Sequence, residues 1–268
     1  MGSTTATAKS PVRAVALPAE HGGWGFTLEP ILLGLLVAPS LPGMFLGIAA
    51  FCAFLVRQPL KIALIDRRRG KRYARTTLAQ RFALLYAGIA ITGVLIAGVM
   101  KGPDVLLPLL VALPFVLVQL TYDARGESRA LLPEIAGPLA LGMVAVSIAV
   151  AGEWELVNAL ALWLIVATRT VPSILYVRAR IRLERGRDNS LVPALAAHVI
   201  GLAILGVFVL GGLVPALALL TMIILLLRAA YNLSSYRPQV AVRMIGFQEL
   251  GFGIVMVILA VAGYQLSF

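Results

Sequence analysis

Long apolar runs, nearly free of charge, follow one another along the whole chain. They cover residues 31–56, 82–100, 105–121, 135–152, 191–227 and 254–265. Hydrophobic and polar residues do not alternate at period two, which is the pattern of outer-membrane β-barrel strands. The runs therefore predict an all-α, polytopic membrane protein, and a composition of 60% hydrophobic and 13% charged residues favours the same class.

Proline, glycine and clusters of charge divide these runs into segments that can cross a bilayer, which takes about 20 residues in a helix. Nine spans result, at 23–38, 43–65, 78–100, 104–122, 131–151, 154–177, 191–210, 213–231 and 246–265. The run 31–56 can also be one long span, which gives eight helices. We favour a hairpin there, because the segment 39–43 (PSLPG) holds two prolines and a glycine. We expect one nine-helix domain over 18–268, after a disordered cytoplasmic tail at 1–17.

Basic residues assign the loops to sides of the membrane, because short loops rich in Lys and Arg stay in the cytoplasm. The chain holds 23 Lys and Arg against 12 Asp and Glu, a formal net charge of +11. With the N-terminus inside, Lys101 alone among the basic residues falls outside, together with Asp104, Glu153 and Glu155. We therefore expect a multi-pass inner-membrane protein with a cytoplasmic N-terminus and an external C-terminus. Anionic membrane lipids, and not nucleic acid, are the expected partners of its basic face.

Two basic clusters carry candidate binding residues, one after the span at 43–65 and one after the span at 154–177. Most of their arginines serve as positive-inside anchors. Arg57, Lys61 and Arg169 differ, because they lie one to two turns inside the helix ends, where charges usually face a bundle interior or a wet cavity. The candidate ligand-binding residues of the two clusters are Arg57, Lys61, Arg169, Ser173, Tyr176, Arg178 and Arg180.

The N-terminal approach to the membrane, HGGWGFTLEP at 21–30, is the most distinctive stretch of the chain. Its glycines permit turns or close approach of another group, and Trp24 suits the membrane interface. Glu29 requires a counter-charge from the basic clusters, because an unpaired carboxylate at low dielectric destabilises a fold. His21 is either a hydrogen-bonded interfacial imidazole or a group that binds a ligand or transfers a proton. With Cys52 as the single cysteine and two histidines, no metal site is expected.

Charged residues at membrane depth gather in the cytoplasmic half. Glu134 lies at the start of one span, Glu249 in the first turns of the last span, and Arg228 near the end of another. The outer half is almost purely apolar, and His198 lies in the middle of a span. This distribution favours a cavity open to the cytoplasm over a polar path across the membrane, which a transporter requires.

Nine spans with functional loops after the second and sixth resemble the intramembrane prenyltransferases of the UbiA superfamily. In that superfamily, two Asp-rich motifs at these places bind a prenyl diphosphate through magnesium. Here the first place holds Arg57, Lys61 and Asp66, and the second holds Ser173, Tyr176, Arg178 and Arg180. The architecture therefore implies a UbiA-like bundle, while the motifs do not support magnesium as the cofactor.

Three motifs give a closer resemblance. HGGWGFTLEP at 21–30, LLGLLVAPS at 32–40 and RQPL at 57–60 are similar to the YwiC-like family of bacterial membrane proteins. This resemblance covers most of the chain. It implies membership of a class of membrane proteins without an established activity.

Lys and Arg bind phosphate without a metal, and Arg often does so with two hydrogen bonds. We therefore expect a basic, cytoplasm-facing cavity that binds an anionic lipid or a prenyl-diphosphate-like ligand. A metal-independent or divergent prenyltransferase is an alternative, with Glu29, Asp66 or Glu134 as the candidate acid or base. A transporter is the second alternative.

Overall fold

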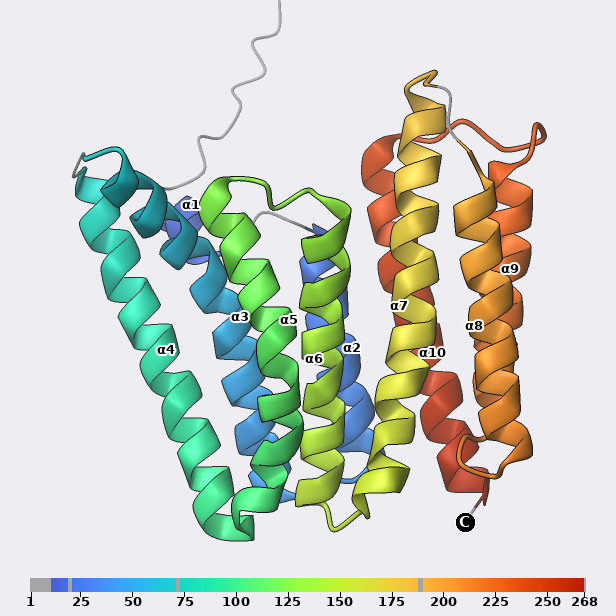
Figure 1. The fold of residues 1–268 in the computed structure, drawn as a ribbon, viewed down its shortest axis with the longest axis horizontal. Coiled ribbons are helices and arrows are strands. Elements are labelled where there is room, and N and C mark those ends of the chain that lie inside the picture. The colour runs from blue at the N-terminus through green and yellow to red at the C-terminus, as the bar shows by residue number, and fades with distance from the viewer. Residues whose placement is uncertain (1–10, 19–20, 71–72, 188–189, 268) are drawn as a thin grey trace, which may run out of the picture.

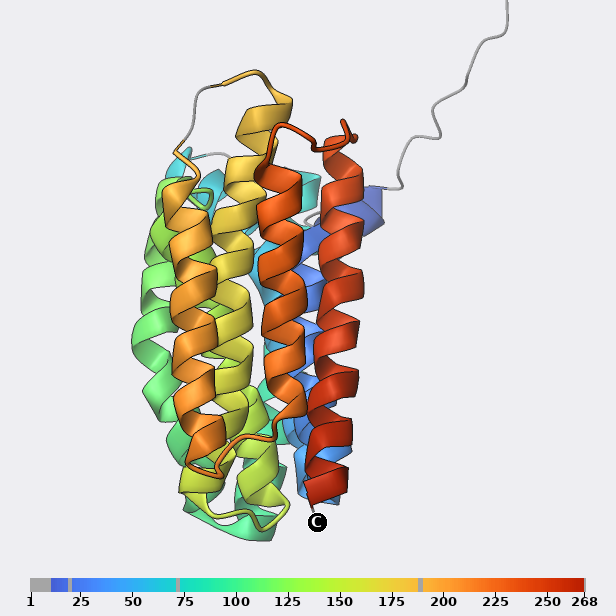
Figure 2. The same ribbon diagram turned by 90° about the vertical axis from the view of Figure 1, so that its right-hand side faces the viewer.

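The computed structural model describes residues 11–18, 21–70, 73–187 and 190–267, and these ranges contain helices and no strand. The helices α2 to α10 lie side by side, and their connections alternate between two ends of the bundle (Figures 1 and 2). The elements are α1 Pro11–Ala16, α2 His21–Val37, α3 Leu41–Arg68, α4 Ala74–Lys101, η1 Pro103–Leu106, α5 Leu107–Arg125, α6 Leu131–Ala151, α7 Leu156–Glu184, α8 Val192–Leu210, α9 Leu217–Leu233 and α10 Val242–Ser267.

Seven helical segments in the described ranges are long and apolar enough to cross a membrane. They are α3, α4, η1 together with α5, α6, α7, α8 and α10. The helices α2 and α9 are also apolar but shorter, at 17 residues each. The all-helical membrane bundle is thus confirmed, whereas the count of nine spans and the UbiA-like arrangement stay predictions.

The first apolar run is divided between two helices. Helix α2 ends at Val37, and Ser40 caps the start of α3, where its Oγ accepts a hydrogen bond from the backbone N–H of Gly43 at 3.1 Å. Pro42 follows in the first turn, where its missing N–H leaves no helix hydrogen bond unmade. One long span over 31–56 is therefore wrong, and the favoured hairpin is present.

The N-terminal tail contains a short helix. Helix α1, Pro11–Ala16, contacts α3 and α4, and its residues Val15 and Ala16 are buried. Disorder over 1–17 is therefore wrong for this segment, because its apolar residues find a surface on the bundle. The predicted disorder of residues 1–10 falls outside the described residues.

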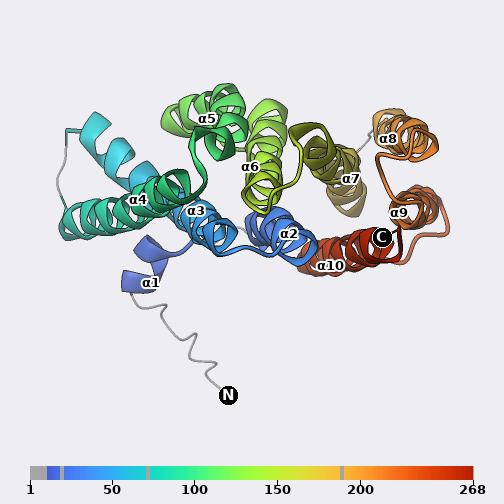
Figure 3. The same ribbon diagram turned by 90° about the horizontal axis from the view of Figure 1, so that it is seen from below.

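The helices form two layers (Figure 3). One layer contains α4, α3, α2 and α10 in that order, and the other contains α5, α6 and α7, while α8 and α9 close the side next to α7 and α10. We call the end with the connections 69–73, 126–130, 185–191 and 234–241 the basic end, because these loops and their flanks carry the arginine clusters. At the opposite end, Lys101 pairs with Glu153 at 2.5 Å, and the hydrogen bond from Lys101 lowers the pKa of the Glu153 carboxyl.

The two layers pack tightly at the end away from the basic loops. Glycines of α2 and α3 lie against Ile148 of α6, and a Cβ on Gly34 would lie 2.9 Å from the Ile148 Cβ. Gly43 and Gly47 approach the same isoleucine. Ile148 is fully buried and belongs to an apolar cluster with Ile31, Leu46 and Val144. This glycine contact closes the bundle at that end.

Replacing Gly34 with leucine tests the tight contact. The Gly34→Leu side chain must displace Ile148, and overpacking of this kind costs about 1–3 kcal/mol of unfolding free energy. Gly88 of α4 is the matched control, because a Cβ there meets nothing within 4 Å. Thermal unfolding in detergent should show a lowered midpoint for Gly34→Leu and little change for Gly88→Leu. Equal midpoints for the two variants would contradict close packing of α2 on α6.

Candidate functional site

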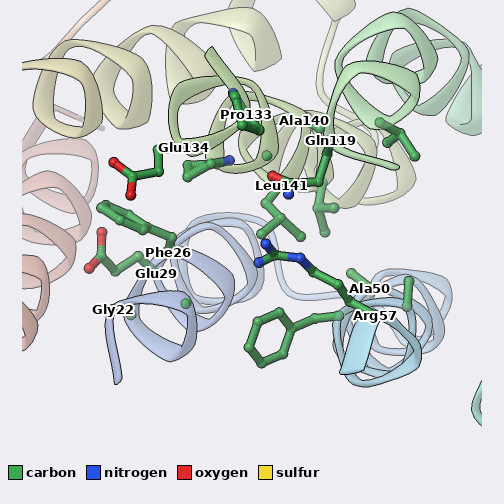
Figure 4. Close-up of a pocket in the computed structure, with 18 of the residues that line it drawn as sticks. Gly22, Phe26, Glu29, Ala50, Arg57, Gln119, Pro133, Glu134, Ala140 and Leu141 are labelled. Carbon is green, nitrogen blue, oxygen red and sulfur yellow. The ribbon is translucent and has the colours of Figure 1, made fainter. Parts of the chain in front are cut away.

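A cavity of about 790 Å³ lies between the two layers and extends from residues at the basic end, such as Arg129, to Leu46 and Leu109 near the opposite end. Residues of α2, α3, α4, α5, α6, α7 and α10 line it. Figure 4 shows residues of α2 and α3 on one wall and residues of α5 and α6 on the other, with Arg57 reaching toward the centre. Most of the lining is apolar, and its charged or polar members are Glu29, Arg57, Gln119, Ser128, Arg129, Glu134, Arg169, Arg178 and Glu249.

Charged groups from three elements surround the opening of this cavity. We call the lining residues Arg57, Ser128, Arg129 and Arg178 the mouth, together with Lys61, which lines a small neighbouring pocket next to Arg57. Lys61 Nζ of α3 donates to Ser128 Oγ at 2.7 Å, and Arg178 Nη1 of α7 donates to the carbonyl of Arg129 at 3.1 Å. The loop 126–130 is therefore held between α3 and α7.

Two arginines of the mouth are already paired with carboxylates. Arg57 makes two hydrogen bonds to the buried carboxylate of Asp123 on α5, at 2.7 and 3.1 Å. Arg178 Nη1 lies 2.6 Å from Glu134 Oε2 on α6. Within the described ranges, Lys61 and Arg129 have no carboxylate at ion-pair distance. These two cations give the mouth a surplus of positive charge.

A buried charge cluster lies deeper, where α2, α7, α9 and α10 meet. Arg169 Nη1 lies 3.0 Å from Glu29 Oε2, and its Nη2 donates to the backbone carbonyl of Glu249 at 2.7 Å. The Glu249 carboxylate pairs in turn with Arg228. All four side chains are at most 11% exposed, so each charge depends on its neighbours. The predicted counter-charge of Glu29 is thus confirmed as Arg169.

The cluster is positioned by aromatic and glycine contacts. The guanidinium of Arg169 lies over the Phe26 ring at 5.3 Å, and that of Arg228 over the Tyr176 ring at 3.9 Å. The Glu29 carboxylate lies against Gly253 of α10, where a Cβ would collide with it. This close approach needs glycine, because any other residue would occupy the space of the carboxylate.

Helix α7 carries the predicted residues of the second cluster on two different faces. Ile174, Val177, Arg178 and Ile181 line the cavity. Ser173, Tyr176 and Arg180 follow Arg169 at intervals of three to four residues, so they share another face of the helix. These three predicted ligand-binding residues do not line the cavity.

Each of these three residues, Ser173, Tyr176 and Arg180, is enclosed on the side of α8 to α10. Tyr176 lies under Arg228, and Ser173 is fully buried. Arg180 Nη2 pairs with Glu184 at 2.8 Å and also donates to the carbonyl of Pro238. His21 begins α2, and its side chain lies outside the described part of the structure.

The three candidate acids separate in the same way. Glu29 and Glu134 line the cavity. Asp66 does not, because its carboxylate accepts hydrogen bonds from Arg75 at 2.8 Å and Thr76 Oγ1 at 2.7 Å, which holds the turn between α3 and α4. Asp66 is thus a turn residue, and of the three candidate acids only Glu29 and Glu134 line the cavity, together with Glu249.

The sequence interpretation missed four residues of the site: Asp123, which neutralises Arg57, the cavity residue Gln119, and the mouth residues Ser128 and Arg129. Arg125 and Arg129 lie in the short loop between the fourth and fifth predicted spans, and these two basic residues could have indicated that the loop belongs to the site. The two larger basic clusters, which follow other spans, were the more prominent pattern.

Several apolar helices around a cavity define this chain as a multi-pass helical membrane protein. A family model described as "YwiC-like protein" matches residues 17–149, and the chain belongs to the YwiC-like family. The matched segment covers α2 to α5 and nearly all of α6, and so most of the cavity wall, but neither α7 nor α10. No curated protein and no solved structure matches the chain.

Removing one member of the buried pair tests its structural role. Arg169→Met leaves the Glu29 carboxylate buried without its partner, which costs about 3–5 kcal/mol of unfolding free energy. The double variant Arg169→Met with Glu29→Gln should regain part of that loss, because no unpaired carboxylate remains. Chemical denaturation in detergent measures both. Lys101→Met, which breaks the exposed pair with Glu153, is the control and should change stability little.

Proposed function

We propose that the protein is an inner-membrane protein that binds an anionic lipid in this cavity. The observation that carries the proposal is the pairing of a positively charged mouth with an apolar interior of about 790 Å³. A ligand that suits both parts has a phosphate or similar anion at one end and hydrocarbon at the other. Cavities of this size are typical of small-molecule sites.

The mouth suits a phosphate without a metal. Lys61 and Arg129 supply unneutralised charge, and Ser128 lies between them in contact with Lys61. Arg57 and Arg178 are fixed by Asp123 and Glu134, so they hold the surrounding loop in place. A charge at the edge of a low-dielectric cavity binds an anion more strongly than the same charge in water.

The apolar part of the cavity reaches the lipid-facing side of the bundle at α4 and α5. Helix α4 packs along α3 and has little contact with α5 except through η1. Ile91 and Leu95 of α4 line the cavity opposite Val116 and Leu120 of α5, and all four are at least 36% exposed. This arrangement supports a ligand whose tail comes from the bilayer rather than from water.

A divergent prenyltransferase is the second candidate, favoured by the candidate acids Glu29 and Glu134, which are two of the three carboxylates that line the cavity. Both carboxylates are held by arginines, which leaves neither as a free base in the resting protein. Purified protein given radiolabelled prenyl diphosphates and crude lipid acceptors separates the two functions. A labelled product that disappears in Glu134→Gln would favour the transferase.

Transport is less well supported by the geometry. The glycine contact around Ile148 closes the cavity at the end away from the mouth. His198 is fully buried, lies outside the cavity lining, and its Nδ1 is 2.7 Å from the carbonyl of Ala194. The described residues thus offer no polar route past the closed end.

Charge removal at the mouth tests lipid binding. Lys61→Ala with Arg129→Ala should weaken binding of phosphatidic acid or phosphatidylglycerol at least about ten-fold, because charge-assisted hydrogen bonds contribute about 1.5–3 kcal/mol each. The matched control is Arg67→Ala with Arg81→Ala, two exposed arginines outside the cavity. Native mass spectrometry or a fluorescent-lipid titration measures the affinity. Equal weakening in both double variants would contradict the proposal, because the loss of affinity would then come from surface charge in general and not from the mouth.

Cysteine labelling tests the proposed orientation. In a Cys52→Ser background, Glu127→Cys lies at the basic end and Glu155→Cys at the opposite end, and both positions are exposed. If the basic end faces the cytoplasm, a membrane-impermeant maleimide added to intact cells should label only Glu155→Cys. Labelling of only Glu127→Cys would reverse the orientation.

A further inference from the structure

One polar side chain interrupts the apolar part of the cavity. Gln119 of α5 lies one residue before Leu120 and three after Val116, and all three line the cavity. Its Nε2 is enclosed and has no hydrogen-bond partner among the described residues. An amide donor kept without a partner in an apolar setting is unfavourable, so its presence there requires a compensating group.

The position of this amide is set by the facing helix. Gly137 of α6 has no side chain, and a Cβ there would lie 2.5 Å from Gln119 Oε1. Gln119 therefore rests on the backbone of α6, inside the space shown in Figure 4. Gln119 lines the cavity, and the last torsion of a terminal amide is broad, so the amide has freedom to turn toward a bound group.

The polar groups of the wall occur in a fixed order of depth. The mouth residue Arg57 pairs with Asp123 of α5, while Lys61 contacts Ser128. Gln119 precedes Asp123 by four residues on α5, which is one helical turn, or about 6 Å. A ligand with its anion at the mouth therefore meets the Gln119 amide about one turn below the Arg57–Asp123 pair.

We propose that the ligand is an acyl-ester phospholipid, in which an ester carbonyl oxygen accepts a hydrogen bond from Gln119 Nε2. This inference rests on the proposed function and specifies its ligand. In a glycerophospholipid the ester carbonyls follow the phosphate after a few bonds, at the depth of Gln119. In a prenyl phosphate, hydrocarbon follows the phosphate directly and offers no acceptor there.

The shape of the cavity agrees with two chains. The lining includes Ile91 and Leu95 of α4, and also Ile181 of α7 and Leu250 of α10. In Figure 3, α4 lies at one end of the layers, and α7 and α10 lie toward the other. Each direction is lined mainly by apolar side chains, so one acyl chain occupies each.

An ester-to-ether comparison tests the proposal. Wild-type protein should bind a diacyl phosphatidic acid about five-fold more tightly than the dialkyl ether analogue of equal chain length, the effect of one hydrogen bond. Gln119→Met keeps the side-chain length but has no donor, and should bring this ratio close to one. Gln248→Met, at an exposed glutamine outside the cavity, should leave the ratio unchanged. Native mass spectrometry with a prenyl phosphate as third ligand measures all three.

The possible results separate this inference from the proposed function. Equal binding of ester and ether by the wild type, or an unchanged ratio in Gln119→Met, overturns the role of Gln119. If these lipids also bind more weakly to Lys61→Ala with Arg129→Ala, the proposed function survives that result. If the wild type binds neither lipid, both proposals fail. The wild-type comparison decides even if Gln119→Met does not fold.

Discussion

The architecture depends on a charge that cannot be left unpaired in the membrane. Arg169 is almost completely buried, and it reaches Glu29 of α2 and the Glu249 carbonyl of α10 from α7. Helices α2 and α7 and the consecutive pair α9 and α10, which are separated in the sequence, must come together to neutralise it and its neighbour Arg228. In water such an ion pair contributes little to stability, whereas in hydrocarbon the loss of one partner leaves a buried charge and strongly destabilises the fold. The cluster therefore specifies which helices are neighbours at this depth.

The two ends of the bundle differ because their residues differ in size and charge. At one end, glycines let α2 and α3 approach α6 until backbone meets side chain. At the basic end, long charged side chains and the loop 126–130 keep the layers apart. Apolar residues such as Leu60 and Val177 then line a space instead of filling one. The same sequence asymmetry that indicates orientation also creates the cavity.

Apolar runs and proline positions were sufficient to predict the helices, and the boundaries of α6 match the predicted span 131–151. The depth of Arg57 and Arg169 also identified them as interior charges. The face of α7 on which Tyr176 and Arg180 lie depends on where α8 to α10 pack, which no local pattern contains. The partner of Arg57 is 66 residues away, so only the fold brings Asp123 to it.

The closed end has a consequence for the length of any bound chain. Leu60 near the mouth and Leu46 at the glycine contact both line the cavity, and along α3 they are separated by about 20 Å at 1.5 Å per residue. Ile148 belongs to the apolar cluster around Leu46 that closes this end. The cavity therefore limits the length of a straight hydrocarbon chain. A chain that exceeds this depth must bend and leave sideways between α4 and α5.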